Sequence, residues 1–420
     1  NRPDIVVAPT STEQVAAVMR LAHRAGVPVT PIAGASGVQG AANANCGGLQ
    51  IDLRRMDRIR HLDPLSQTCT VEAGLILRTF ESWLTDRGWT FTHDPASAEW
   101  ASVGGAVAAR GSGVLSSKYG NIQDHVLSLE VVMPDGDVVS LPAVPKHGVG
   151  PELTQLFVGS EGTLGVIVGI TLRLFGVPER IAAAVCSFAE MGAAVRTVIE
   201  TMQMQVPLAR IELLDEVQMT ACNRYSKLTY PETPTLFLEF HGTEAGVAEQ
   251  IETVQAIAAH HGGGEFAFAH EAEARNRLWQ ARHEAYYAAL ALRPGAKGWP
   301  TDVCVPISRL ADCILETKRD LAENRLLAPL VGHVGDGNFH LVFVLDPDDP
   351  EELARASAAN DRLVMRALAM DGTCTGEHGV GYGKMPFLLA EHGEALSVMR
   401  AVKQALDPLG IMNPGKIVAV

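Results

Sequence analysis

Three glycine-rich segments in the first 165 residues constrain the fold of this chain more than any other feature. They span residues 31–40, 103–113 and 157–165. Loops without side-chain bulk let successive backbone N–H groups converge on a phosphate or pyrophosphate. None of them has the G-x-G-x-x-G spacing of a Rossmann nicotinamide site, and the Gly383-Lys384 pair lacks the flanking residues of a P-loop. The segments therefore indicate a phosphate-binding site outside these two classes.

The composition limits the classes of protein further. The chain has 420 residues, of which 47% are hydrophobic, enough for two or three domains with a sizeable core. Its formal net charge of −14 argues against non-specific nucleic-acid binding, which needs a basic surface. A small anionic substrate remains compatible with this charge, because local clusters of Arg and Lys override the net field.

The location of the protein is also constrained by its sequence. No stretch approaches the ~18 uninterrupted apolar residues of a membrane-spanning helix. The chain starts at Asn1 without a signal-like segment, and we expect that a few leading residues were trimmed. The seven cysteines are scattered and include no C-x-x-C pair, which indicates a reducing compartment rather than a disulfide framework. We expect a cytoplasmic protein.

The first third of the chain alternates between strand and helix patterns. Periodic apolar positions predict a helix that Ser11 or Thr12 caps and Gly26 ends. A second helix is predicted over residues 76–88, and a hairpin closed by Asp-Gly is predicted over residues 126–141. This alternation favours an α+β fold.

The pattern changes after Pro178. Residues 179–345 read as repeated strand–helix–strand units, which are typical of an antiparallel sheet covered by helices. The chain is mostly helical from residue 349, with glycine-rich breaks at 372–383 and 407–415.

Two histidines and a later Glu-His pair form the most specific chemical pattern. The Gly-Asp-Gly turn between His333 and His340 lets one strand end and the next begin, which brings both imidazoles together. Glu377 and His378 add a carboxylate and a third imidazole on another flexible loop. Two His and one carboxylate suit a divalent Zn, Mn or Fe centre with open positions. Asp336 is the weaker candidate, because it is expected to cap its own turn.

The order of the three glycine-rich segments resembles the FAD-binding domain of the vanillyl-alcohol oxidase/p-cresol methylhydroxylase (PCMH-type) flavoproteins. In that family the first segment holds the pyrophosphate, the second lines the flavin, and the third runs as a strand along the cofactor. Ala33, Ala35 and Ala41 stand where glycine is common. No residue resembles the family's covalent attachment site, so the resemblance implies non-covalent FAD. The FAD-binding residues that it implies are Ala33, Gly34, Ala35, Ser36, Gly37, Ser102, Gly104, Gly105, Ala109, Gly111, Ser112, Glu161, Gly165, Val166, Ile167 and Asn413.

From about residue 272 the resemblance narrows. The segments 279–298 and 301–310, the His333 motif, and the segments 372–379 and 407–417 are similar to those of FAD-dependent D-lactate dehydrogenases of the cytochrome-linked type. Glycolate oxidase FAD subunits and D-2-hydroxyglutarate dehydrogenases are close relatives within that family. The resemblance implies oxidation of a D-lactate-like 2-hydroxy acid to the 2-oxo acid, with glycolate and D-2-hydroxyglutarate as alternative substrates.

The resemblance also implies a role for each site residue. Arg282 and Lys297 would hold the substrate carboxylate, and Tyr286, one helical turn after Arg282, would line the same pocket. The metal, Zn or Mn first, would be held by the pair of histidines and by Glu377. It would polarise the 2-hydroxyl, whose proton His378 would take while the hydride passes to flavin N5. Asn413 and Lys416 resemble C-terminal positions that return to the flavin.

A second resemblance leaves another class of function open. Arg110-Gly-Ser-Gly and the segment 118–124 are closer to alkyl-dihydroxyacetone-phosphate synthase, a non-redox transferase of the same fold. The histidine spacing in the second half does not provide the run of histidines found in that transferase.

The resemblance finally implies an organisation and partners. We expect a PCMH-type FAD-binding domain of two α+β subdomains over residues 1–178 and a substrate-binding cap domain over 179–375. A C-terminal segment, 376–420, is expected to return to the FAD domain. The implied electron acceptor is a quinone, a cytochrome or an electron-transfer flavoprotein, with the enzyme at most peripheral to a respiratory membrane. A homodimer is compatible with the resemblance.

Overall fold

The computed structural model describes residues 2–144, 148–269 and 271–418 and divides the chain into two compact units. The first unit comprises Asn1–Gly113, Gly120–Val177 and Glu377–Val420. The second comprises Val114–Tyr119 and Pro178–Gly376. The domain boundary predicted at residue 178 assigns residues 114–119 to the first domain. In the structure they belong to the second unit, where their apolar side chains pack against Ala209. The predicted domain boundaries themselves stay a prediction.

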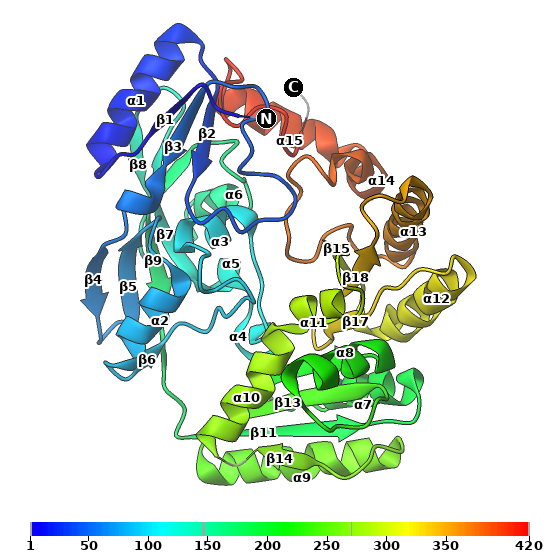
Figure 1. Ribbon diagram of the computed structural model, residues 1–420. Helices are drawn as coiled ribbons and strands as arrows, with labels where there is room; N and C mark the ends of the chain where they lie inside the picture. The colour runs from blue at the N-terminus through cyan, green and yellow to red at the C-terminus, as the bar shows by residue number, and fades with distance from the viewer. Residues whose placement is uncertain (1, 145–147, 270, 419–420) are drawn as a thin grey trace. The chain divides into compact units, whose positions relative to one another are not determined.

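A three-stranded parallel sheet of order β1-β3-β2 opens the first unit (Figure 1). Its strands are β1 (Ile5–Val7), β2 (Val29–Ile32) and β3 (Leu49–Asp52). The predicted first helix is confirmed as α1 (Thr12–Ala25). Ser11 caps its first turn by accepting a hydrogen bond from the Gln14 N–H, and Gly26 ends it in the left-handed region at φ 62°.

A five-stranded antiparallel sheet of order β4-β5-β9-β7-β8 forms the second layer of the first unit. The predicted hairpin is confirmed, because β7 and β8 pair antiparallel. The remaining short pair is β6 with β10. The strand bounds are β4 (Ile59–Asp63), β5 (Thr68–Glu72), β6 (Trp89–Thr90), β7 (Val126–Val132), β8 (Val138–Ser140), β9 (Val166–Arg173) and β10 (Phe175–Gly176). The helices between them are η1 (Leu53–Arg55), α2 (Leu77–Thr85), α3 (Val103–Ala109), α5 (Ile122–His125) and α6 (Leu153–Phe157).

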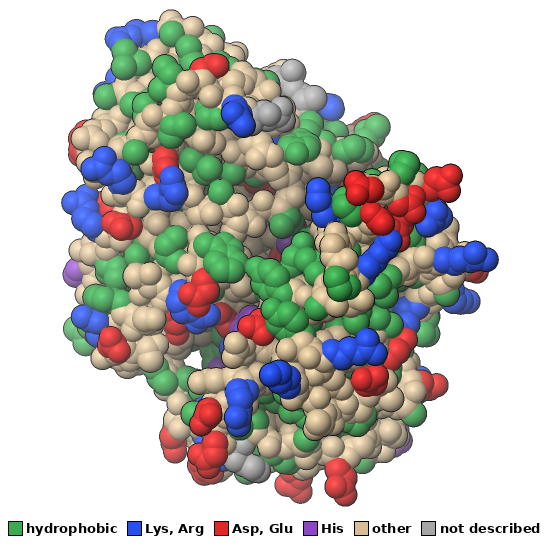
Figure 2. Space-filling model, viewed as in Figure 1, with side chains coloured by type: hydrophobic (Ala, Val, Ile, Leu, Met, Phe, Trp, Pro, Cys, Tyr) green, Lys and Arg blue, Asp and Glu red, His purple; other side chains and the backbone are tan. Residues whose placement is uncertain are grey.

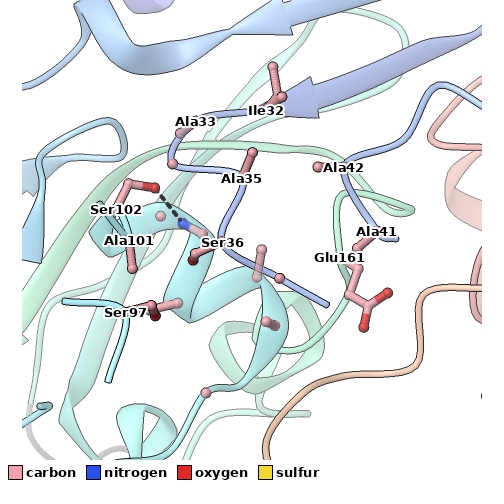
Figure 3. Close-up of a pocket in the computed structure, with 18 of the residues that line it drawn as sticks. Ile32, Ala33, Ala35, Ser36, Ala41, Ala42, Ser97, Ala101, Ser102 and Glu161 are labelled. Carbon is pink, nitrogen blue, oxygen red and sulfur yellow. Dashed lines mark hydrogen bonds between the residues drawn. The ribbon is translucent and has the colours of Figure 1, made fainter. Parts of the chain in front are cut away.

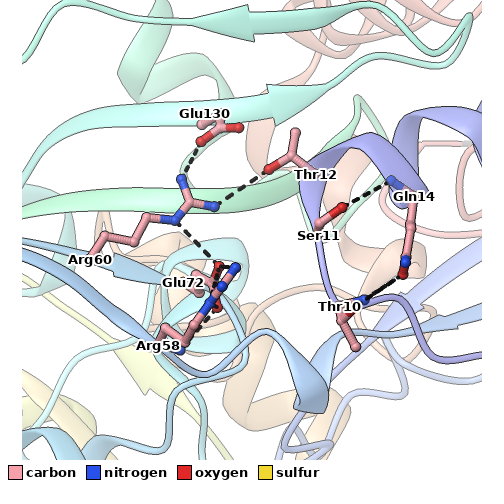
Figure 4. A network of polar contacts seen from close by, with 8 residues as sticks. All are labelled: Thr10, Ser11, Thr12, Gln14, Arg58, Arg60, Glu72 and Glu130. Carbon is pink, nitrogen blue, oxygen red and sulfur yellow. Dashed lines mark hydrogen bonds and ion pairs between the residues drawn. The ribbon is translucent and has the colours of Figure 1, made fainter.

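A polar network around the buried Glu72 ties α1 to this sheet (Figure 4). Arg60 of β4 contacts Glu130 of β7, donates to the Thr12 hydroxyl over 3.4 Å, and lies 3.5 Å from Glu72. Arg58 donates to both oxygens of the fully buried Glu72. Burial acts to raise the pKa of Glu72, but the hydrogen bonds from Arg58 outweigh it and hold the pKa below its ordinary value. The network keeps this carboxylate ionised inside the core.

The C-terminal segment returns to the first unit beside β2. Backbone hydrogen bonds of 2.7 Å join Val29 to Ile411 and to Asn413. Behind this junction Lys403 donates to Asp407 and to the carbonyls of Thr163 and Met412. The helices of this segment are η3 (Met385–Phe387), α14 (Leu388–His392) and α15 (Ala395–Leu406).

The second unit is built on an eight-stranded sheet whose neighbouring strands pair antiparallel. Its main path has the order β14-β11-β13-β12-β17-β18-β15, and β16 also pairs with β18. The strands are β11 (Arg180–Ser187), β12 (Leu208–Leu214), β13 (Thr235–Gly242), β14 (Ala267–Ala269), β15 (Lys297–Pro300), β16 (Val303–Cys304), β17 (Leu330–His333) and β18 (Asn338–Leu345). An antiparallel sheet was expected here, and it is confirmed.

Helices cover this sheet (Figure 1). The apolar core under α8, α10 and α11 contains Leu214, Met219, Phe237 and Trp279. On β12 and β13 the side-chain direction alternates, so Arg210 and Glu212 share a face with Leu214, and Glu239 shares one with Phe237. The helix bounds are α4 (Ser116–Tyr119), α7 (Met191–Gln203), α8 (Glu216–Ser226), α9 (Glu244–His260), α10 (Ala272–His283), α11 (Ala285–Ala291), η2 (Ile307–Arg309), α12 (Leu310–Glu323) and α13 (Pro350–Ala369).

Charged side chains of both signs are interspersed over the face seen in Figure 2. This distribution agrees with the argument against a nucleic-acid surface. Among the described residues, no helix is both long and apolar enough to cross a membrane.

Candidate functional site

A cavity of ≈ 320 Å³ within the first unit is lined by residues of all three glycine-rich segments. Ala35 and Ser36 border it from the first segment, Ser102 from the start of α3, and Glu161 from the third segment (Figure 3). The predicted FAD-binding residues that line it are Ala33, Gly34, Ala35, Ser36, Gly37, Ser102, Gly104, Gly105, Ala109, Gly111, Ser112, Glu161, Gly165 and Ile167. Gly, Ala and Ser dominate this lining, so backbone groups border the cavity.

Two glycines allow the segments to approach each other. A Cβ atom on Gly34 would lie 2.2 Å from the carbonyl oxygen of Trp100. A Cβ atom on Gly104 would lie 2.5 Å from the Cβ atom of Ala73. Ala35, by contrast, is accommodated in the first loop, although its φ of 54° lies in the left-handed region that favours glycine. The fold therefore tolerates alanine at this position of the first loop but has no room for it at Gly34 or Gly104.

The third segment does not form the expected strand. Residues 158–165 are a loop, and β9 begins only at Val166. The reason lies in the backbone: Glu161 and Gly162 both have positive φ, of 49° and 73°, which a strand does not accommodate. Val166 is fully buried in the apolar core and does not line the cavity.

Asn413 cross-links two of the segments from behind the cavity. Its side-chain amide donates to the carbonyl of Ala41 over 2.9 Å and to that of Glu161 over 2.7 Å. Lys416, which is almost fully buried, donates to the carbonyl of Asn43 over 2.6 Å. The two C-terminal residues therefore hold the loops in place rather than lining the cavity.

Glu377, His378 and His93 line the same cavity. The first two were predicted as site residues, while sequence analysis missed His93, which stands alone in a polar stretch. Burial, followed by the nearby His125, lowers the pKa of His93 to about 4, so its ring is neutral at physiological pH. The cavity is thus lined by two carboxylates, Glu161 and Glu377, and by two imidazoles, beside its glycine-rich walls.

The second unit brings His333 and His340 together, as the turn between them predicted. Their ring centroids lie 5.4 Å apart, at the end of β17 and near the start of β18. Nδ1 of His333 lies 2.7 Å from Oε1 of Glu212, and Nδ1 of His340 lies 2.9 Å from the carbonyl of Thr301. A metal would therefore bind each ring through Nε2.

Glu212 is a site residue that sequence analysis missed. The strand register places it directly opposite His333, and Arg282 donates to its second oxygen from Nε over 2.8 Å and from Nη2. Burial acts to raise the pKa of Glu212, but Arg282 and then His333 outweigh it and lower the pKa. The signal was present: β12 reads Leu-Ala-Arg-Ile-Glu-Leu-Leu, with two charges alternating on one face of a buried strand.

The predicted carboxylate-binding residues occupy different settings. Arg282 is 6% exposed and is paired with Glu212 as described, whereas Lys297 is exposed at the start of β15. The helix expected to carry both Arg282 and Tyr286 is interrupted: α10 ends at His283 and α11 begins at Ala285. The Tyr286 hydroxyl contacts the carbonyl of Gly298 instead, over 3.4 Å, and so lies beside β15.

The two aspartates near the histidine pair have distinct partners. Asp336 accepts a hydrogen bond of 2.5 Å from the Ser116 hydroxyl, a partner outside its own turn. Asp302 accepts from the Asn338 amide over 2.8 Å and lies 3.7 Å from Nδ1 of His340. Asp302 therefore belongs to the polar surroundings of His340.

The fold and the cavity together define a class, the PCMH-type flavoproteins. A solved structure of p-cresol methylhydroxylase with substrate bound matches with a TM-score of 0.82 at 19% identity, over 99% of this chain and 88% of that one. An alkyldihydroxyacetonephosphate synthase structure matches with a TM-score of 0.78 at 22% identity, over 99% and 77%. Identities this low establish the fold alone.

The chain belongs to the FAD-linked oxidases: the FAD binding domain model matches residues 3–142 and the FAD linked oxidases C-terminal domain model matches residues 177–417. It binds FAD and is an oxidoreductase. The probable mitochondrial D-lactate dehydrogenase of Danio rerio is 47% identical over 99% of this chain and 84% of its own. The mitochondrial D-lactate dehydrogenase [cytochrome] of Arabidopsis thaliana is 44% identical over 100% of this chain and 74% of its own.

Proposed function

We propose that this chain oxidises the 2-hydroxy acid D-lactate to its 2-oxo acid. The observation that carries the proposal is that Glu377 and His378 line the same cavity as the three glycine-rich segments. A group able to accept a proton therefore stands beside the site of a redox cofactor. The names of the Danio rerio and Arabidopsis thaliana relatives supply the substrate.

The cavity fits a bound FAD, because its lining is dominated by small residues and backbone atoms. When bound, FAD supplies an acceptor for the hydride that leaves C2 of the substrate. The chain then has to remove the hydroxyl proton, so that the C–O bond becomes a carbonyl. We assign this task to His378, which acts as general base. The FAD is bound non-covalently in this proposal.

The donor set of His333, His340 and Glu377 fits a divalent metal, with Zn or Mn as the first candidates. The anchored Nδ1 atoms of the two histidines support this assignment, because metal-binding histidines characteristically use their second nitrogen in this way. The metal would supply a Lewis acid that lowers the pKa of the 2-hydroxyl.

The substrate carboxylate needs a cationic partner, and we propose Arg282 and Lys297 for it, with Tyr286 beside them. Arg282 is fixed from one side by Glu212, so its position is set before substrate arrives. Lys297 is exposed, and its ammonium group is a compact point charge at the end of a four-carbon stem. Tyr286 lies beside Gly298, the residue after Lys297.

The proposal extends to partners and location. The word cytochrome in the name of the Arabidopsis thaliana relative supports a respiratory electron acceptor, which we take to be a cytochrome, a quinone or an electron-transfer flavoprotein. Both relatives are named as mitochondrial proteins, so we propose a mitochondrial location in place of the cytoplasmic one predicted from the sequence. A homodimer remains part of the proposal.

Anaerobic bleaching of the flavin tests this function. D-Lactate is expected to bleach the flavin within one turnover, and re-oxidation by an added cytochrome c is expected to restore the colour. L-Lactate serves as the matched control and is expected to leave the spectrum unchanged. Faster bleaching by glycolate or D-2-hydroxyglutarate would identify that acid, instead of D-lactate, as the substrate. Bleaching by none of them, together with turnover of an acyl-dihydroxyacetone-phosphate, would establish the transferase instead.

A further inference from the structure

The carboxylate of Glu161 binds the backbone of the loop that follows Glu377 and His378. Its Oε1 accepts from the N–H of Val380 over 2.6 Å, and its Oε2 accepts from the N–H of Gly381 over 2.8 Å. A Cβ atom on Gly379 would lie 2.2 Å from Oε1. Both oxygens of the carboxylate therefore accept hydrogen bonds from one short stretch of backbone, immediately after Glu377 and His378.

The backbone of Glu161 is itself fixed by two hydrogen bonds. Its N–H donates to the carbonyl of Ala108 over 2.9 Å, and its own carbonyl accepts from the Asn413 amide over 2.7 Å. Its backbone has a φ of 49°, so the side chain leaves the loop in a direction that a strand would not allow. The residue is 6% exposed and lines the cavity. Its position is thus determined independently of the loop that it binds.

The chemistry of the contact requires a carboxylate. Two N–H donors converge on the side chain, and each needs an acceptor. A glutamine would offer one acceptor and would point its own NH₂ group at the second donor. Hydrogen bonds from N–H to an ionised carboxylate are about twice as strong as neutral ones, and burial strengthens them further. Burial raises the pKa of Glu161 to about 7, against the two N–H donors and the charge of Lys416, so the carboxylate is ionised above that pH and the test below is run there.

We propose that Glu161 is a positioning residue for His378: it holds the backbone of residues 379–381 and thereby sets where the imidazole stands in the cavity. The inference rests on the proposed role of His378 as general base. The resemblance had assigned Glu161 to FAD binding, whereas both of its oxygens are directed to the loop. Misplacement of a base by about 1 Å costs roughly 10²-fold in rate, so the anchor has a measurable effect on catalysis.

Hydrogen–deuterium exchange on the FAD-loaded Glu161→Gln enzyme tests the proposal. The amides of Val380 and Gly381 are expected to exchange at least about 10-fold faster, because one charge-assisted bond is lost. Flavin content and metal content are expected to stay at the wild-type level, while flavin reduction by D-lactate slows by about 10- to 100-fold. The matched control is Glu152→Gln, an exposed carboxylate that accepts from the Thr154 N–H at the start of α6. It is expected to change neither measurement.

Each other outcome has a defined meaning. Unchanged exchange at residues 380–381 overturns the proposal, and loss of flavin with unchanged exchange makes Glu161 a flavin contact. Faster exchange in an enzyme that no 2-hydroxy acid reduces leaves the anchor in place and refutes the proposed function instead. If Glu161→Gln does not fold, Gly379→Ala displaces the loop while Glu161 stays intact, since its Cβ would meet Oε1. Wild-type exchange and reduction rates in Gly379→Ala would then overturn the proposal.

Discussion

Nδ1 of His333 lies 2.7 Å from Oε1 of Glu212, although 121 positions separate the two residues in the sequence. The second oxygen of the same carboxylate accepts from Arg282. One buried glutamate therefore orients a proposed metal ligand and a proposed substrate-binding residue together. Such outer partners of a ligating histidine set its tautomer and raise its basicity.

Replacing this carboxylate should weaken the metal site. We expect Glu212→Gln to lower metal affinity by about 10- to 100-fold, because the amide cannot support the imidazole as the carboxylate does. Competition with a chromophoric chelator measures the affinity. Glu239→Gln is the matched control: it lies on the neighbouring strand, bound to Arg210 and His241 rather than His333. Equal affinities in the two variants would contradict the assignment.

Arg282 should contribute to stability as well as to binding. Arg282→Met leaves the fully buried Glu212 without one partner, and we expect a loss of about 3–5 kcal/mol in the free energy of unfolding. Arg196→Met, at an exposed ion pair with Glu190, should cost no more than about 1 kcal/mol. Urea unfolding measures both.

A double variant separates the two roles of Arg282. Arg282→Met with Glu212→Leu removes both buried charges and should recover part of the stability. Glu212→Leu alone is the reference for activity, because the loss of Glu212 also affects His333. If Arg282 also binds the substrate carboxylate, kcat/KM of the double variant should lie about 10- to 150-fold below that of Glu212→Leu. Equal kcat/KM in the two variants would assign Arg282 to structure alone.

A further prediction concerns the space around two glycines that line the cofactor cavity. Gly34→Ala and Gly104→Ala each place a methyl group under 3 Å from neighbouring atoms, so we expect both variants to lose most of their FAD. Gly176→Ala, which meets nothing within 4 Å, should retain it. Flavin absorbance of the supernatant after acid precipitation gives the content. Flavin that stays with the pellet in the wild type would contradict non-covalent binding.

The features that depend on local pattern were predictable from the sequence. The helix capped by Ser11, the hairpin β7–β8 and the turn between His333 and His340 each follow from spacing within about ten residues. Local sequence patterns did not predict the features that depend on tertiary contacts. Glu161 reaches a backbone 219 positions away, and only the register of β12 against β17 places Glu212 opposite His333.

Two differences from the predicted elements have different origins. The helix break between Arg282 and Tyr286 carries no Gly or Pro, so no residue in the sequence marks it. The positive φ of Glu161 replaces the expected strand with a loop, and it is sustained by Ala108 and Asn413, which contact it from other parts of the chain. Long-range contacts overrode the local preference in the second case.

The titration of Glu161 should appear in the pH dependence of stability. Burial raises the pKa of Glu161 from 4.5 to about 7, against the opposing effects of the two N–H donors and Lys416. Between these values the native state keeps a proton that the unfolded chain releases, so stability falls as pH rises from 4.5 to about 7. The contribution is roughly 3 kcal/mol. Thermal unfolding of the FAD-saturated Glu161→Gln variant should show a flatter profile across this window, and a slope parallel to the wild type would contradict the shift.

The last prediction distinguishes a base from a ligand at the adjacent pair Glu377 and His378. Both line the cavity, but neighbouring residues in an extended loop point apart, so they need not serve the same centre. If His378 takes the hydroxyl proton, His378→Ala should retain FAD and metal and slow flavin reduction by ~10²–10⁴-fold. Stopped-flow reduction with protiated and C2-deuterated D-lactate, alongside metal analysis, measures this.

Glu377→Gln is the matched variant for that experiment, because it should release the metal while keeping the imidazole. Loss of metal from His378→Ala with full retention in Glu377→Gln would make His378 the metal ligand and leave the general base unassigned. In that case His93 is the next candidate to examine, since its ring lines the same cavity and is neutral at physiological pH. A neutral imidazole is the form that accepts a proton, so the cavity holds a second group of the required chemistry.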